Sequence, residues 1–378
     1  MARKIMEGSI AMAHTAALCR LNVVAAYPIT PSTHIPEELS KKLADYEFIP
    51  VEAEFSAISA LIGASCAGAR TFTATSSQGL LLMHEALHNA AGMRLPIVMA
   101  VANRSVSAPL NIWCDWQDSI SQRDTGWVQL YCKNNQEAVD TLIQSFKIAE
   151  SAQVPVMVCV EGFFLTHLIA PVDLPSQEQV DKFLPKFAPK HSLDVDKPMA
   201  FGTYAFPNPY YEIRKDHAQI MNASLPIIER VAAEFEREFG RKQFALMEDY
   251  AGTVRGSKTV IVSMAALAEN IELAVDSLRQ KKESVGLLRL KCFRPFPSKQ
   301  LSAALSSTER IIVFEKDICL GLEGALATEL KAALQDAGVK IPVIGIICGL
   351  GGKDVKVSEL EAAYEKFKNA KEPSSQWL

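Results

Sequence analysis

The sequence lacks the clustered cysteines that hold an iron–sulfur cluster. Its eight cysteines stand at least eighteen positions apart and fall mostly within apolar stretches. Cluster-binding chains place several cysteines about two to four residues apart, so any cluster that serves this protein is expected on another chain. The same scatter is typical of reduced, buried thiols in a cytoplasmic protein and argues against a disulfide framework.

A basic run and a long apolar run are also missing. With 39 Lys and Arg against 43 Asp and Glu, the net charge of −4 leaves no electrostatic footprint for nucleic acid or an anionic membrane. Glu7, His14 and Arg20 interrupt the apolar N-terminal stretch, which argues against both a signal peptide and a membrane span there. The expected partners are therefore small molecules and other proteins, in the cytoplasm.

The sequence does contain short apolar runs that alternate with amphipathic stretches of helix length, the pattern of a parallel α/β sheet. At 378 residues the chain exceeds the usual size of one hydrophobic core, so two domains are expected, at 1–255 and 256–378. In the first, strands are predicted at 23–27, 70–75, 96–102 and 154–160, and helices at 7–19, 33–43, 54–67, 79–91 and 135–151.

Seven prolines between residues 170 and 222 are expected to break any regular element, leaving an extended arm. A connecting helix is predicted at 225–250 and a linker at 251–258. In the second domain, strands are predicted at 259–263, 284–289, 310–314 and 343–347, and helices at 267–279, 299–305, 321–337 and 358–368. A glycine-rich turn at 349–353 fits no phosphate-binding spacing.

The first polar cluster, Tyr-Pro-Ile-Thr-Pro-Ser at 27–32, follows a predicted strand and precedes a predicted helix. Ligands of parallel sheets bind beyond the carboxyl ends of the strands, and the prolines on both sides stiffen the turn and direct the hydroxyl of Thr30. The alternative is a simple helix cap by Ser32 or Thr33.

The second cluster contains Glu52 and Glu54, at the start of a helix rich in small residues. The helix dipole alone favours carboxylates at this position. However, a helix lined with small residues packs closely against its neighbour, so a carboxylate at its mouth would be partly buried and able to take part in proton chemistry.

The third cluster is the turn at 75–79, a possible cofactor contact at a helix N-terminus, and it leads into His84-Glu85-x-x-His88. The two histidines and the glutamate match the signature of zinc hydrolases. A catalytic zinc needs a third protein ligand, and no extension that would supply one follows here.

The fourth cluster is the polar stretch at 103–127, which holds two arginines, three aspartates and three tryptophans. As a loop at the carboxyl edge of the sheet it could bind a carboxylate through Arg104 and shield it with aromatic rings. In the alternative interpretation the arginines and aspartates only pair with one another.

Together these segments resemble the alpha subunit of archaeal and bacterial pyruvate:ferredoxin oxidoreductases. The similarity runs from AAYPITPST through VEAEFSAISALIGASCAGARTFTATSSQGLLLMHEALH and RLPIVMAVANRSVSAPLNIWCDWQDSISQRDTGW to VPVMVCVEGFFLTH, LRLKCFRPFP and CGLGGKDV, which is nearly the whole chain. The resemblance implies a parallel-sheet pyrimidine-type domain for thiamine diphosphate, followed by a smaller α/β domain like the C-terminal domain of transketolase.

The resemblance also implies roles for single residues. Glu54 would bind the aminopyrimidine of the cofactor, Thr30 and Arg104 would position a small 2-oxoacid, and no residue would bind metal. Further cofactor contacts are implied for Pro28, Ile29, Ser77 and Gln78, and a substrate loop for Asn111, Asp115, Trp116 and Gln117. This sequence departs from pyruvate-type relatives at 114–117, where they more often carry a histidine after the aspartate, so the substrate stays open at this point.

The resemblance implies a multi-subunit enzyme. The chain has no Gly-Asp-Gly stretch, so the diphosphate-binding domain and its Mg²⁺ are expected on a beta subunit. Gamma and ferredoxin-like delta subunits are also expected, and [4Fe-4S] clusters are expected on partner subunits. Coenzyme A is expected as the co-substrate and ferredoxin as the electron acceptor.

Pyruvate is the expected substrate. Arg104 can pair with one carboxylate only, and Trp113 and Trp116 should limit the room beyond the carbonyl. The alternatives are a branched-chain or 2-oxoglutarate oxidoreductase subunit, a zinc hydrolase that uses His84 and His88, and a non-catalytic assembly subunit.

Overall fold

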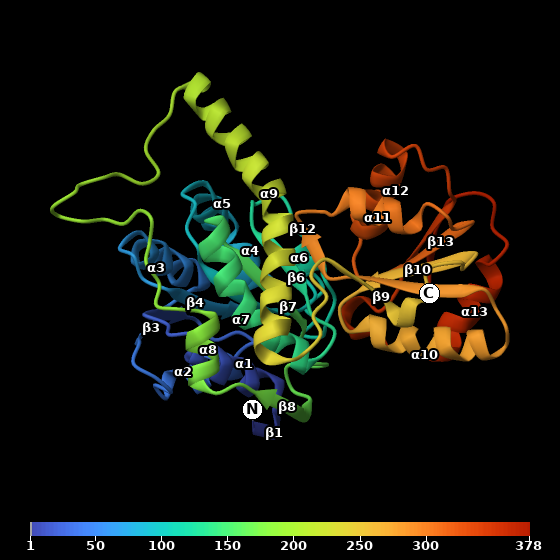
Figure 1. Ribbon diagram of the computed structural model, residues 1–378, viewed down its shortest axis with the longest axis horizontal. Coiled ribbons are helices and arrows are strands. Elements are labelled where there is room, and N and C mark those ends of the chain that lie inside the picture. The colour runs from blue at the N-terminus through green and yellow to red at the C-terminus, as the bar shows by residue number, and fades with distance from the viewer. Residues whose placement is uncertain (1) are drawn as a thin grey trace.

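A seven-stranded sheet lies at the centre of the first half of the chain (Figure 1). The computed structural model describes residues 2–378. In spatial order the strands are β12 (Cys292–Arg294), β6 (Val128–Tyr131), β7 (Val156–Glu161), β5 (Val98–Asn103), β4 (Thr71–Thr75), β2 (Val23–Ala26) and β3 (Glu47–Pro50). All neighbours are parallel except β12, which is antiparallel to β6. The carboxyl ends of the parallel strands therefore meet at one edge.

Alternate residues of the strands divide the core into two layers, because successive side chains point to opposite faces. On β5, Val98 and Ala100 face one layer, whereas Met99 and Val101 face the other. The helices of the first layer are α1 (Gly8–Leu18), α7 (Asn135–Ala152) and α9 (Pro207–Phe239). Those of the second are α3 (Glu54–Cys66), α4 (Ser77–Leu82) and α5 (His84–Gly92).

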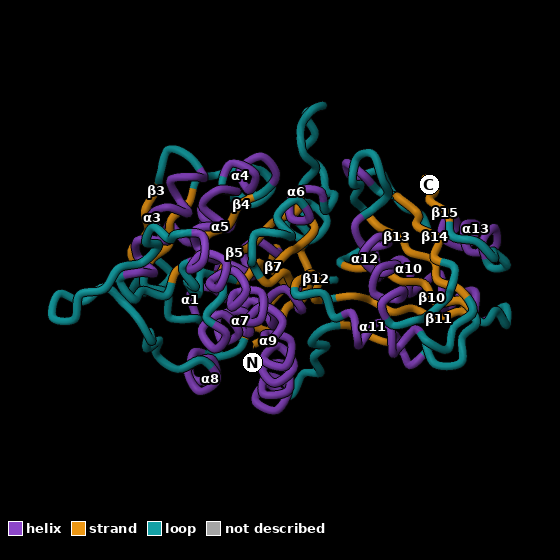
Figure 2. The backbone as a smooth tube through the Cα atoms, turned by 90° about the horizontal axis from the view of Figure 1, so that it is seen from above, coloured by secondary structure: helices purple, strands orange, loops and turns teal. Residues whose placement is uncertain are grey.

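A six-stranded sheet forms the second unit, which lies beside the first in both views (Figures 1 and 2). Its order is β15 (Ser374–Trp377), β14 (Val343–Ile347), β13 (Arg310–Glu315), β10 (Thr259–Met264), β11 (Val285–Leu290) and the antiparallel β9 (Met247–Asp249). Helices α10 (Leu267–Gln280) and α13 (Val357–Phe367) pack together, as do α11 (Ser298–Leu305) and α12 (Ala325–Asp336). The two pairs lie on opposite sides of the sheet (Figure 1).

Short elements complete the fold. They are β1 (Ala2–Glu7), which pairs with β8 (Ile169–Leu174), helices α2 (His34–Ser40), α6 (Gln117–Ile120) and α8 (Gln177–Phe183), and 3-10 turns at Tyr250–Gly252 and Leu350–Gly352. All eight strands predicted from the sequence are present. The predicted helix at 79–91 is wrong in one respect, because it is two helices that meet at Met83. Seven strands were not predicted, since they are short or lack a long apolar run: β1, β3, β6, β8, β9, β12 and β15.

The proline-rich region is more regular than predicted. Residues 184–206 do form an extended arm that leaves the body of the protein (Figure 1), but β8 and α8 precede the arm and α9 follows it. Pro171 is tolerated because β8 has a single neighbour, β1. Pro207 stands in the first turn of α9, where its missing N–H is not needed. The helix predicted at 225–250 therefore begins earlier and ends at Phe239.

The two units are firmly connected. Strand β12 comes from the second half of the chain but completes the first sheet, so a division at residue 255 stays a prediction. Buried ion pairs join α7 to β11, with Arg289 Nη2 2.9 Å from Glu137 Oε1 and Lys291 Nζ 3.4 Å from it. Burial raises the pKa of the Glu137 carboxyl, but these two cations outweigh it and lower the pKa to about 2.

We expect this connection to fail in acid. A carboxyl whose pKa falls from 4.5 to about 2 on folding contributes roughly 3 kcal/mol above pH 4.5, and loses it as the pH falls from there toward 2. Glu137→Gln should remove this contribution of roughly 3 kcal/mol at neutral pH, while Arg289 keeps its ion pair with Glu248, 2.8 Å away. Denaturant unfolding at pH 7 and at pH 3 measures the free energy of unfolding of the natural protein and of this variant. The exposed Glu178→Gln is the control. An equal loss in the two variants would contradict the role.

Within residues 2–378, no helix combines the length and apolar character needed to cross a membrane. All eight cysteines are free thiols, and seven of them are buried, as the sequence predicted.

Candidate active site

Four polar segments converge at the carboxyl edge of the first sheet. The turn after β2 holds Thr30, the turn after β4 holds Ser77 and Gln78, and the loop after β5 begins at Arg104. Since β2, β4 and β5 are neighbouring parallel strands, their ends lie together. Three of the four polar clusters picked from the sequence therefore do meet in space, and the fourth, at Glu54, joins them through α4.

The carboxylate of Asp118, in α6, is the centre of this network. Each of its oxygens accepts two N–H groups at 2.7–3.0 Å, which belong to Ser77, Asn103, Arg104 and Ser119. Asp118 is completely buried. Burial raises its pKa to about 7, although the hydrogen bonds from Asn103, Ser77 and Arg104 act in the opposite direction. Asp118 thus ties the ends of β4 and β5 together.

Arg104 connects the loop after β5 to the turn after β2. Its Nη1 donates to the carbonyl of Thr30 at 2.8 Å and its Nε to the carbonyl of Asn111 at 3.0 Å. Nη2 donates to no acceptor among residues 2–378, and the side chain is 6% exposed. Thr30 itself is exposed, as is Pro28, whereas Ile29 is half-buried. One edge of the guanidinium thus remains able to bind an anion.

Ser77 is held in a left-handed conformation at the start of α4, with φ of 47°. Such a conformation costs a non-glycine residue of order 1–3 kcal/mol and persists only where the surroundings enforce it. Here Asp118 accepts its N–H, and its hydroxyl donates to the carbonyl of Ser105 at 2.5 Å and to Gln78. Gln78 in turn donates to Ser107. The turn at 75–79 is therefore locked to the loop after β5.

Glu54 is the first residue of α3, and its side chain is only 7% exposed. Its carboxylate lies directly over Gly79, where a Cβ would stand 2.5 Å from Glu54 Oε1, so any larger residue would collide with it. No side chain or N–H group within residues 2–378 donates a hydrogen bond to this carboxylate. Glu52, by contrast, is exposed and accepts from Ser56 at 2.7 Å.

A buried carboxylate without a protein donor fits a ligand that supplies the donor, because an unpaired buried charge is costly. Glu54 therefore meets the requirement for binding an N–H group of a heterocycle such as an aminopyrimidine. Large apolar side chains surround this position at the surface, with Phe55 42% and Leu82 53% exposed. Such side chains are common where a partner covers a protein.

The loop at 111–117 is engaged by the second unit. Asn111 donates to the carbonyl of Gly351 at 3.0 Å, and Asp115 accepts the N–H of Gly351 at 3.0 Å. Gln117 accepts the N–H of Ile318 at 3.2 Å. Burial raises the pKa of Asp115 to about 6. The turns of the second unit thus hold this loop in place.

Trp116 does not border a substrate pocket, which corrects one expectation from the sequence. Its ring is fully buried, and Nε1 donates to Glu161 Oε1 at 3.1 Å. Glu161, at the end of β7, is also paired with the buried Lys316 from the end of β13, 2.6 Å away. Trp113 is 49% exposed and packs on Phe163, with ring centroids 4.6 Å apart. Only Trp113 remains available to limit a pocket.

His84 and His88 lie one turn apart on α5, with their rings in edge contact at 5.0 Å. His84 Nδ1 is 2.6 Å from Gln122 Oε1, an amide oxygen. Among the described side chains, only one group of three candidate metal-ligand atoms falls within 4.8 Å, and it includes neither histidine. The structure therefore adds no third ligand to the hydrolase signature.

Three residues of the network were not predicted from the sequence. Asp118 stands between Gln117 and Ser119, Glu161 follows an apolar strand, and Lys316 stands between two acidic residues. A charge in such a setting is usually a solvated surface group. The one available signal was position, because Asp118 and Glu161 follow the carboxyl ends of predicted strands.

The chain is similar to known proteins over nearly its whole length. Residues 14–233 match the family described as pyruvate flavodoxin/ferredoxin oxidoreductase, thiamine diP-bdg, and residues 257–360 match pyruvate:ferredoxin oxidoreductase core domain II. Pyruvate synthase subunit PorA of Methanosarcina barkeri is 50% identical over 372 residues, 96% of this chain and 92% of that protein. Ketoisovalerate oxidoreductase subunit VorA of Pyrococcus horikoshii is 42% identical over 375 residues, 98% of this chain and 95% of that one.

A solved structure shares the fold. It is 2-oxoglutarate:ferredoxin oxidoreductase from Magnetococcus marinus, with a TM-score of 0.73 at 19% identity. The alignment covers 96% of this chain and 65% of that longer chain. The likeness extends over both α/β units, as the predicted fold class requires.

Proposed function

The chain belongs to the pyruvate flavodoxin/ferredoxin oxidoreductase family, and from this premise we propose that it is the alpha subunit of a thiamine diphosphate-dependent enzyme that oxidatively decarboxylates pyruvate to acetyl-CoA and CO₂. The observation that carries the proposal is the buried Glu54 carboxylate, which accepts no hydrogen bond from residues 2–378 and lies over Gly79 near the ends of the strands. Electrons would pass to ferredoxin, and the reaction is reversible.

Glu54 would hold the pyrimidine ring of the cofactor. When bound, thiamine diphosphate would supply a nucleophilic thiazolium carbon for the reaction with the 2-oxoacid. The carboxylate of Glu54 would accept a ring N–H and stabilise the tautomer that removes the thiazolium proton. Gly79 leaves the space for this carboxylate, and Ser77 and Gln78 would line the ring on the α4 side, with Pro28 and Ile29 on the β2 side.

Arg104 would bind the substrate carboxylate through Nη2, which donates to no acceptor in the described part of the chain. Its other donors fix the guanidinium to Thr30 and Asn111, so that its position is set before the substrate arrives. The hydroxyl of Thr30, on the exposed side of the same turn, would bind the carbonyl group.

The partners follow from what this chain does not contain. A beta subunit with the diphosphate-binding domain and its Mg²⁺ would cover Phe55 and Leu82, which are exposed beside Glu54. The [4Fe-4S] clusters would lie on partner subunits, among them gamma and ferredoxin-like delta subunits, because the eight cysteines here are scattered, free and mostly buried. Coenzyme A would enter as the co-substrate.

A branched-chain 2-oxoacid is the second candidate substrate. Its support is the 42% identity to a ketoisovalerate oxidoreductase subunit and the burial of Trp116, which removes one of the two rings expected to restrict the pocket. Pyruvate remains the proposal because relatives named pyruvate synthase are up to 50% identical and Trp113 stays at the surface of the loop. A dicarboxylate would bury a second charge without a partner, which is costly.

We expect the complete enzyme to show a higher kcat/KM for pyruvate than for 2-oxoisovalerate and 2-oxoglutarate. Arg104→Ala should raise KM for all three by about 10- to 100-fold, the worth of one charge-assisted hydrogen bond. Steady-state assays with a viologen as the electron acceptor measure kcat and KM for each oxoacid. Arg123→Ala, which removes an arginine that pairs with Glu329 instead, is the matched control. Preference for 2-oxoisovalerate would replace pyruvate by the branched acid, and an unchanged KM in Arg104→Ala would remove Arg104 from the site.

A further inference from the structure

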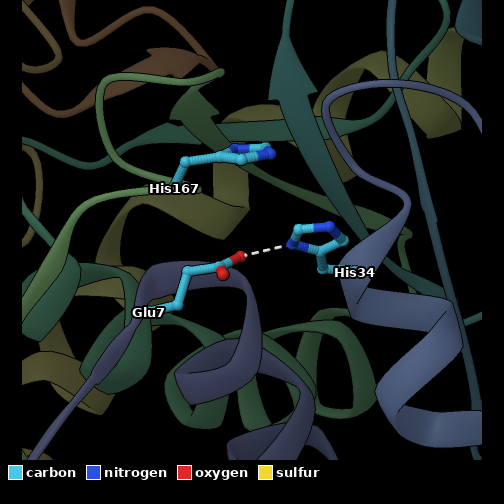
Figure 3. A group of neighbouring side chains, drawn as sticks. All are labelled: Glu7, His34 and His167. Atoms are coloured by element: carbon cyan, nitrogen blue, oxygen red, sulfur yellow. Dashed lines mark hydrogen bonds and ion pairs between the residues drawn. The ribbon is translucent and has the colours of Figure 1, made fainter.

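Glu7, His34 and His167 bring three potential metal ligands together from three separate segments (Figure 3). Glu7 ends β1, His34 begins α2 and His167 lies in the loop between β7 and β8. One ligand atom from each lies within 4.8 Å of the other two. Glu7 Oε1 and His34 Nδ1 are 2.7 Å apart, and all three side chains are half-buried. In Figure 3 the Glu7 carboxylate points toward the His34 ring, and the His167 ring lies above it.

The backbone holds these segments in register before any ion binds. The first N–H groups of α1, from Gly8 and Ser9, donate to the carbonyls of Leu168 and Thr166 at 3.1 and 2.9 Å. A Cβ at Gly8 would stand 2.2 Å from the carbonyl oxygen of Leu165, so the two segments approach as closely as glycine allows. Glu7 and His167, 160 positions apart, are therefore fixed beside each other.

His167 is also oriented by its neighbours. Its Nδ1 lies 2.8 Å from Thr166 Oγ1, which accepts the N–H of Phe163, and its ring packs on Phe163 at 4.7 Å. A metal-binding histidine commonly donates its second ring N–H to such an oxygen, which fixes the ring and its tautomer. With Nδ1 engaged in this way, Nε2 is the atom of His167 that is available to a metal.

We propose that Glu7, His34 and His167 bind one divalent first-row transition-metal ion, and we commit to Zn²⁺. Two imidazoles and one carboxylate are the ligands such ions prefer, whereas Mg²⁺ and Ca²⁺ prefer oxygen alone. With metal–ligand bonds of about 2.0–2.1 Å, tetrahedral coordination places ligand atoms roughly 3.3 Å apart. Small rotations of the side chains reach that geometry, and exchange the Glu7–His34 hydrogen bond for two metal bonds.

The ion would join the segment next to the Thr30 turn of the active site to two other segments. His34 lies four positions after Thr30, and the loop that holds His167 packs on the same turn, since a Cβ at Gly162 would stand 2.4 Å from Pro31. A bound ion would therefore fix the turn after β2 against α1 and the loop after β7. This inference needs neither the cofactor nor a partner chain, so its outcome is independent of the proposed function.

The test is a Zn²⁺ titration of the purified full chain after chelation and dialysis, in competition with a chromogenic chelator. We expect one ion per chain. His34→Ala, His167→Ala and Glu7→Gln should each weaken binding by about 100-fold or more, because loss of an outer-shell partner alone commonly costs 10- to 100-fold. Bound Co²⁺ should show a visible absorption band in the natural chain that the three variants lack.

The control is the His84→Ala/His88→Ala double variant, which removes the other histidine pair and should still bind one ion. Zn²⁺ should raise the melting temperature of the natural chain and of this control but not of the three ligand variants, whose fold is checked by circular dichroism. Absence of a stoichiometric ion in the natural chain would overturn the proposal whatever the variants do. So would an ion that survives His34→Ala and His167→Ala, or one that disappears in the double variant.

Discussion

Glu54→Gln should lower kcat of the assembled enzyme by about 100- to 10,000-fold, the range of a single acid–base group. The amide has nearly the shape of the carboxylate, so the variant should fit over Gly79 as Glu54 does. It cannot, however, stabilise a positive charge or the proton-accepting tautomer on the ring it binds. Hydrogen–deuterium exchange at the thiazolium carbon measures this step directly, apart from later electron transfer.

Glu52→Gln is the matched control for that variant. Glu52 stands two positions away at the same helix start, but it is exposed and bonded to Ser56. Its kcat should stay within about twofold of the natural enzyme, since surface substitutions away from a site change little. If Glu54→Gln exchanged at the natural rate and Glu52→Gln did not, the roles of the two glutamates would have to be reversed.

Asp118→Ala should have the largest effect on stability. It leaves four N–H groups, from Ser77, Asn103, Arg104 and Ser119, without their acceptor in a region where Asp118 is fully buried. An unsatisfied buried donor costs about 1–3 kcal/mol, and water entering the space left by the side chain would satisfy some of the four. We expect the free energy of unfolding to fall by roughly 3–6 kcal/mol, measured by denaturant titration.

The same variant should also reveal that Asp118 is a positioning residue. Release of the Arg104 and Ser77 backbones should raise KM for the oxoacid by about 10- to 100-fold with a smaller change in kcat, because small misplacement of a binding group is costly. Asp118→Asn keeps one acceptor oxygen and should restore part of both losses. Asp124→Ala, an exposed aspartate of the same loop, is the control. A fall in stability with KM unchanged would show that the network supports only the fold.

Several parts of the site could be predicted from the sequence because they depend on local pattern. The turn with Thr30, the turn with Ser77 and Gln78, and the start of the Arg104 loop each follow an apolar run, and the ends of parallel strands meet at one edge. The small residues near Glu54 likewise predicted a close contact, which Gly79 makes. The roles given to these residues remain predictions.

Whether a side chain of a loop faces the core or the solvent could not be predicted in the same way. Trp116 and Trp113 are three positions apart in one loop, yet the first is fully buried on Glu161 and the second is half exposed. In a loop without a regular period, neighbouring residues carry no rule for which side faces the core. The prediction for the proline-rich region was wrong in part for a related reason. Proline is excluded from the interior of helices and of central strands, but not from edge strands or from the first turn of a helix.

The sequence by itself determined the long helices and the apolar strands of this protein, the order of its two sheets along the chain and the family to which it belongs, because hydrophobic periodicity and motif spacing act over a few residues. The tertiary structure decided what lies between those elements. It brings Gly351 into contact with Asp115, which lies 236 positions earlier in the sequence, and Lys316 into contact with Glu161, 155 positions earlier. It also brings Glu7 and His34 beside His167. Such contacts depend on strand register and on how two units dock, and no local pattern of residues encodes a distance between segments that meet only after folding.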